Sequence, residues 1–156
     1  HAWWSRWIRE GWFEWEPDGW PFWSATHHWS TWWTVRDRPN VLFVHYGDLK
    51  TNPHGEIRRI ADFYGVDAND ERINAVARAT DFDTMKQTAL ANEAAQGGNV
   101  GSLFEGGVGR FLFKGTNGRW RDLLTDAELA QNDEKMASLD PSLRAWLEAG
   151  RAAVAW

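Results

Sequence analysis

The sequence predicts an α/β protein that is mostly helical in this chain, with one parallel-type strand near residues 41–46. The run VLFVHY at 41–46 is short, apolar and partly β-branched, which is typical of a strand buried on both faces. Helix-start signals follow this run directly, and a strand followed by a helix at this spacing is an αβ pattern. Most of the remaining apolar residues recur at helical spacing, so helices should dominate.

Length and composition suit a single domain with a sizeable core. The chain has 156 residues, of which 43% are hydrophobic and 13 are tryptophan. It has no cysteine, which excludes disulfides, thiolate metal sites and a cysteine nucleophile and fits the reducing cytoplasm. No apolar run reaches the roughly 20 residues that a bilayer span needs, so we expect no membrane partner. The net charge of -5 argues against nucleic acid as a partner.

Ten of the tryptophans lie within residues 1–33. Trp3, Trp4 and Trp7 have helical spacing, and residues 22–35 again show a helical pattern with one broad aromatic face. Such side chains could line a groove for a sugar or an aromatic ligand, or they could form a core or contact further protein. Helical spacing is what packing requires, so we favour the second interpretation. A tryptophan-rich glycan- or aromatic-binding module is the alternative function.

Local signals mark the helices after the predicted strand. Asn52 can cap a helix that starts at Pro53 and ends near Gly65. Asn69 can cap the next helix, over residues 70–79. The pattern predicts further helices over residues 82–90, 126–136 and 141–153, and a loop over residues 91–102.

The stretch Gly106 to Arg121 is rich in glycine and carries four cations and no acid, although the whole chain is acidic. Glycines allow backbone N–H groups to approach a ligand closely. Lys114 followed by Gly115 is a candidate phosphate contact, because it places a point charge beside an approachable backbone. The alternative is an ordinary surface loop whose cations are solvated.

The histidines do not form a metal-site pattern. His27 and His28 are adjacent, and adjacent residues on a helix point about 100° apart, so they cannot easily share a metal. His1 is a copper candidate only if a second histidine lies beside it in space. We expect no metal and assign no catalytic residue in this chain.

Three segments carry a further pattern. They are VLFVHYGDLKTNPHGEIRRIADFYGV (41–66), TDFDTMK (80–86) and FLFKGTNGRWRDLLT (111–125). In this order and spacing they resemble the C-terminal half of the cytosolic-type sulfotransferases. The corresponding family patterns are Y-E-D-L-K, T-S-F-x-x-M-K and F-x-R-K-G-x-x-G-D-W-K-N-x-F-T. The likeness covers about residues 20–137.

The resemblance implies a P-loop-like three-layer fold and a known chemistry. Such enzymes transfer a sulfuryl group from 3′-phosphoadenosine 5′-phosphosulfate (PAPS) to a hydroxyl or amine of a small-molecule acceptor. Carried over by position, four residues would surround the adenine: Tyr46, Thr80, Phe82 and Met85. Lys114 and Gly115 would hold the 3′-phosphate.

The departures from the family pattern also carry information. Phe113 stands where the family has a phosphate-binding arginine, and Arg110 is the candidate replacement. Gly47 stands in place of the glutamate of Y-E-D-L. The segment Leu124-Thr125-Asp126 differs from the family's pairing segment, which leaves dimerisation open.

The family's phosphosulfate loop and catalytic histidine and lysine have no counterpart in residues 1–156. We therefore expect a partial sulfotransferase domain without the phosphosulfate-loop half, arising from a truncated gene, a partial sequence or a decayed paralogue. The isolated chain is expected to be inactive.

Overall fold

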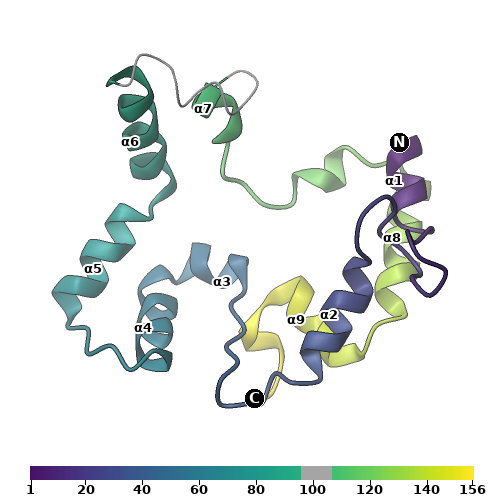
Figure 1. Cartoon of the computed structure of the whole chain (residues 1–156), viewed down its shortest axis with the longest axis horizontal. Helices are drawn as coiled ribbons and strands as arrows, with labels where there is room; N and C mark the ends of the chain where they lie inside the picture. Colours follow the sequence, from purple (N-terminus) through teal and green to yellow (C-terminus); the bar gives the residue numbers. More distant parts are fainter. Residues whose placement is uncertain (96–106) are drawn as a thin grey trace. The chain divides into compact units, whose positions relative to one another are not determined.

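The structure of the chain, a computed structural model, describes residues 1–95 and 107–156 (Figure 1). The chain divides into two compact units, a first unit of residues 1–51 with 118–156 and a second unit of residues 52–117. The first unit contains α1 (Ala2–Trp7), α2 (Ala25–Trp33), α3 (Tyr46–Thr51), η2 (Arg119–Asp122), α8 (Asp126–Ala137), α9 (Pro141–Ala149) and η3 (Arg151–Ala153). The second unit contains α4 (Pro53–Phe63), α5 (Asp70–Ala79), α6 (Phe82–Ala95) and α7 (Gly107–Phe111).

The predicted helix starts are confirmed where side chains cap the backbone. The side chain of Asn52 accepts a hydrogen bond from the N–H of Gly55 at 3.2 Å, so α4 begins at Pro53. Asn69 accepts from the N–H of Arg72 at 3.0 Å and starts α5 in the same way. A cap satisfies a backbone N–H that the helix itself leaves without a partner.

Two boundaries differ from the prediction. Helix α6 continues to Ala95, so the predicted loop over 91–102 is wrong at its first residues, where alanines favour a helix. The part of that loop from residue 96 onward, and Gly106 with it, lie outside the described residues. Helix α9 ends at Ala149 because Gly150 follows with a φ of +77°, and the 3-10 turn η3 comes after it.

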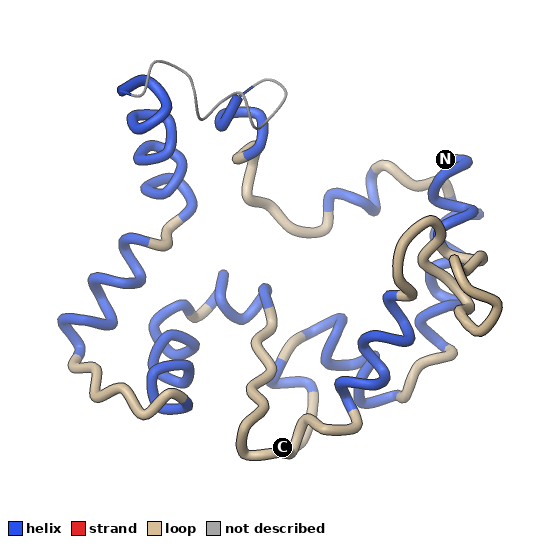
Figure 2. The backbone as a smooth tube through the Cα atoms, viewed as in Figure 1, coloured by secondary structure: helices blue, strands red, loops and turns tan. Residues whose placement is uncertain are grey.

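The predicted strand near 41–46 is not found among the residues that the structure describes (Figure 2). Residues 41–45 have no regular structure, and Tyr46 is the first residue of α3 instead of the last residue of a strand. A strand is defined by its hydrogen bonds to a neighbouring strand, and the described residues supply no such neighbour. The parallel-sheet part of the prediction therefore remains unconfirmed.

The core of the first unit forms where α2 meets α9. Trp33 is only 4% exposed and its indole Nε1 donates to the hydroxyl of Ser142 at 3.0 Å. The ring of Trp33 lies 5.5 Å from that of Phe43 and 5.7 Å from that of Trp146, centroid to centroid. The cluster is completed by Leu139 and Leu143, with Trp29, Met136, Leu147 and Val154 packed around it. The core interpretation of the tryptophans is therefore right for Trp33.

Two buried carboxylates organise the tryptophan-rich segment before α2. Glu16 accepts hydrogen bonds from the backbone N–H groups of Trp12, Phe13 and Ser24 at 3.1–3.2 Å. Asp18, 1% exposed, accepts from the hydroxyls of Ser24 and Thr26. These bonds hold a turn that leaves aromatic side chains around a small open pocket lined by Trp12, Phe13, Pro21, Phe22 and Trp23.

The helices of the second unit pack in chain order, α4 on α5, α5 on α6 and α6 on α7. Among the residues that the structure describes in this unit, Ile73 of α5 and Val108 of α7 are the buried apolar ones. The carboxylate of Glu93 accepts from the N–H of Val108 at 3.2 Å, which joins α6 to the start of α7. In the described ranges no helix is both long and apolar enough to cross a membrane.

Candidate functional site

The loop after α7 lies against the first turn of α6, and this brings two predicted site residues together. Gly115 has a φ of +59°, and a Cβ at this position would lie 2.6 Å from Cδ2 of Phe82. A heavy-atom separation that short is a steric collision, so glycine allows the backbone to meet the aromatic ring. The backbone of the predicted phosphate loop thus touches the side of a ring predicted to contact adenine.

A second contact ties the same loop to α6. The ammonium of Lys86 donates to the carbonyl oxygen of Phe113 at 3.0 Å, and it lies 5.9 Å from the ring centroid of Phe82. Sequence reasoning missed this role of Lys86. No local sequence pattern predicts this contact, because Lys86 and Phe113 are 27 positions apart.

The start of α6 is fixed by a cap that sequence reasoning also missed. The carboxylate of Asp81 accepts from the backbone N–H groups of Asp83 and Thr84, both at 3.2 Å, and from the Thr84 hydroxyl at 3.3 Å. An aspartate directly before a helical segment is a usable sequence signal for such a cap. The cap orients the first turn of α6, which carries Phe82 and the half-exposed Met85.

Thr80 is the C-cap of α5, and its hydroxyl points back along that helix. It donates to the carbonyl of Val76 at 2.9 Å and is 3.4 Å from that of Ala77. Because the hydroxyl hydrogen is engaged, the oxygen offers lone pairs to a ligand. In this position Thr80 can accept a hydrogen bond from a ligand amine.

The predicted phosphate-binding side chain, Lys114, is exposed. Its ammonium lies 5.1 Å from the ring centroid of the neighbouring Phe113. Arg110, the candidate replacement for the family arginine, is in the last turn of α7 and exposed. The local charge of this loop is therefore positive and open to a ligand.

Tyr46 belongs to the first unit, whereas the other five predicted residues belong to the second. It is 53% exposed and opens α3. The residues on either side of it, His45 and Gly47, hydrogen-bond to each other at 3.2 Å. Over the described part of the chain, no group of three or more histidine or acidic side chains is placed to hold a metal ion.

Comparison with known proteins identifies the relatives of this chain. A sulfotransferase domain model matches residues 18–140. Rat sulfotransferase 1C2 is 32% identical over 106 residues, which cover 68% of this chain and 34% of the relative. Rat sulfotransferase 1A1 is 31% identical over 110 residues, with coverages of 70% and 36%. The chain thus spans about a third of the length of these curated relatives.

Among solved structures, mouse sulfotransferase SULT7A1 complexed with PAP superposes with a TM-score of 0.61 at 22% identity, over 85% of this chain and 45% of that one. This likeness supports a sulfotransferase fold. It does not favour a tryptophan-rich binding module. Because the domain model matches most of its residues, this chain belongs to the sulfotransferase family.

Proposed function

We propose that this chain supplies the 3′-phosphoadenosine part of the donor site in a PAPS-dependent sulfotransferase. The observation that carries the proposal is the contact between Phe82 and Gly115. It joins an aromatic ring, suited to a flat base, to the backbone of a glycine that directly follows Lys114 in the sequence. One small region thereby offers partners for the two chemically distinct ends of an adenosine phosphate.

The neighbouring groups fit the same ligand. An exposed thioether such as that of Met85 adapts to a flat ring, and the Thr80 oxygen can accept from an exocyclic amine. Lys114 and the N–H of Gly115 would share the 3′-phosphate as charge-assisted donors. The mouse relative SULT7A1 was solved in complex with PAP, which supports a nucleotide of this kind.

In the whole protein, a hydroxyl or amine of a small-molecule acceptor would attack the sulfur of PAPS. The bond from sulfur to the 5′-phosphate oxygen would break, 3′-phosphoadenosine 5′-phosphate (PAP) would leave with that electron pair, and the proton of the acceptor would pass to the solvent. Tyr46 is proposed as a further adenine contact, and residues 1–156 as part of one cytoplasmic sulfotransferase domain. No metal is required for this transfer as proposed. The inactivity of the isolated chain stays a prediction.

The test is calorimetric titration of PAP into the wild-type chain and into a variant that lacks the Lys114 side chain. The Lys114→Ala variant should raise the Kd by about 10- to 150-fold, because hydrogen bonds to charged groups contribute about 1.5–3 kcal/mol. The matched control is Arg72→Ala, which removes one exposed positive charge from α5 of the same unit and should leave the Kd within about twofold. Equal effects of the two variants, or no binding of PAP, would contradict the proposal. Incubating the chain with PAPS and an acceptor tests its predicted inactivity.

A further inference from the structure

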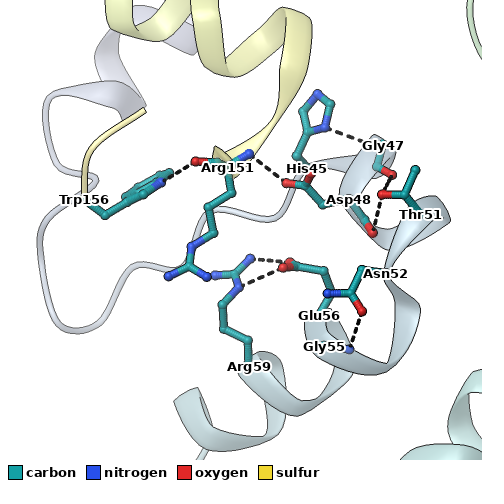
Figure 3. A network of polar contacts seen from close by, with 10 residues as sticks. All are labelled: His45, Gly47, Asp48, Thr51, Asn52, Gly55, Glu56, Arg59, Arg151 and Trp156. Carbon is teal, nitrogen blue, oxygen red and sulfur yellow. Dashed lines mark hydrogen bonds and ion pairs between the residues drawn. The ribbon is translucent and has the colours of Figure 1, made fainter. Parts of the chain in front are cut away.

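Both ring nitrogens of His45 have a defined partner in the first unit, and Figure 3 shows the bond between His45 and Gly47. The backbone N–H of Gly47 donates to Nδ1 at 3.2 Å. Nδ1 must therefore be unprotonated, so the ring hydrogen is on Nε2, which lies 3.2 Å from the carbonyl oxygen of Leu147. The tautomer follows from this network. The ring also packs edge-on against Trp146, with centroids 5.3 Å apart and planes at 75°.

A second side chain holds the same turn of α3. The carboxylate of Asp48 accepts from the backbone N–H of Arg151 at 2.8 Å (Figure 3). Gly150 has a φ of +77°, and a side chain there would collide with the Asp48 carboxylate. The first turn of α3 is thus attached at two points to the end of α9 and the start of η3.

Gly47 is part of this arrangement. A Cβ at Gly47 would lie 2.9 Å from Cε1 and 3.0 Å from Nδ1 of His45. Any larger residue would have to push the imidazole away and would weaken the contact with Leu147. Gly47, which replaces the glutamate of the family pattern, therefore leaves the space that the ring of His45 occupies.

We infer that His45 is a positioning residue, whose neutral imidazole, seated on Gly47, fixes the first turn of α3 on α9 and so sets the position of Tyr46. Tyr46 lies between the two bonded residues and is 53% exposed. The role in ligand binding rests on the proposed function, in which Tyr46 contacts the adenine.

The first measurement needs no variant. Nitrogen-15 spectra of the histidine rings in the chain should show His45 with a protonated Nε2 and a bare Nδ1. A proton on Nδ1, in either a neutral or a charged ring, would overturn the inference. Amide hydrogen exchange should show a protected Gly47 N–H that exchanges about tenfold faster in His45→Phe, which removes both nitrogens and keeps an aromatic ring. An unchanged exchange rate would also overturn it.

The second measurement is the Kd for PAP. His45→Phe should raise it about fivefold, the change expected if the binding-competent position of Tyr46 falls to about a fifth of the population. His45→Asn, which keeps an acceptor near the Nδ1 position, should recover part of the loss. The control His54→Phe changes an exposed histidine of α4 and should have no effect. If His45→Phe fails to fold, Gly47→Ala displaces the ring with an intact histidine and should raise the Kd in the same direction.

A double-mutant cycle separates positioning from direct contact. In a Tyr46→Ala background, His45→Phe should change the Kd by less than about twofold, because the residue that it positions is gone. A full fivefold effect in that background would refute the positioning role. If the wild-type chain does not bind PAP, the proposed function fails, while the ring tautomer and the Gly47 exchange rate still decide the role of His45.

Discussion

Replacing Gly115 by alanine tests how closely the Lys114–Gly115 loop packs on α6. Two costs are expected. An alanine with a φ near +59° is strained by about 1 kcal/mol. In addition, its Cβ would start 2.6 Å from the ring of Phe82, and forcing extra atoms into such a contact costs about 1–3 kcal/mol. The total loss of stability is therefore about 2–4 kcal/mol.

The chain contains a matched control for the strain alone. Gly65 has a φ of +66°, and a Cβ there would have nothing within 4 Å. Gly65→Ala should therefore cost only about 1 kcal/mol. The assay is amide hydrogen exchange at Ile73, which is 2% exposed and whose N–H donates to the Asn69 carbonyl at 3.1 Å. This amide reports opening of the second unit, which contains both glycines.

A second variant decides whether Phe82 is the cause. In a Phe82→Ala background the collision is removed, so Gly115→Ala should cost no more than Gly65→Ala. If the ring of Phe82 did not pack on the loop, Gly115→Ala and Gly65→Ala would lower the stability equally in the wild-type background. That result would refute the contact on which the proposed nucleotide site depends.

Two further predictions concern the first unit. Glu128 accepts hydrogen bonds from the backbone N–H and the hydroxyl of Thr125, both at 2.8 Å, and these bonds, the backbone N–H first, lower the pKa of its carboxyl although burial opposes them. Because the pKa of Glu128 is lower in the folded chain, the stabilisation is present above the ordinary carboxyl pKa of about 4.3 and is lost as the pH falls through the folded value. Thermal unfolding between about pH 6 and pH 3 should therefore show a shallower loss of stability in Glu128→Gln than in the wild type. Parallel curves for the two proteins would contradict this prediction. Trp33→Phe removes the hydrogen bond to Ser142 and part of a buried ring, so unfolding by urea should show that the chain is less stable by about 2 kcal/mol. The control Trp32→Phe, at a position 50% exposed, should change the stability by less than about 0.5 kcal/mol. A loss of stability of the same size at both positions would argue against the core formed by α2 and α9.

The sequence by itself determined the helices that begin with a local cap. Asn52 and Asn69 start α4 and α5 because each side chain needs only a backbone N–H three residues ahead. The family is likewise a property of the sequence, because its motifs persist in order and spacing. Asp81 could have been included on the same principle, since it is an aspartate directly before a helix.

Tertiary structure alone decided the contacts between distant residues. Helical spacing does not distinguish Trp33, which is buried, from Trp32, which is exposed; the face that meets α9 does. The ring of Phe82 against Gly115 and the ammonium of Lys86 on Phe113 depend on how a loop and a helix pack. The apolar run at 41–46 shows the same limit, because a strand exists only through hydrogen bonds to a partner strand, and no local pattern can supply that partner.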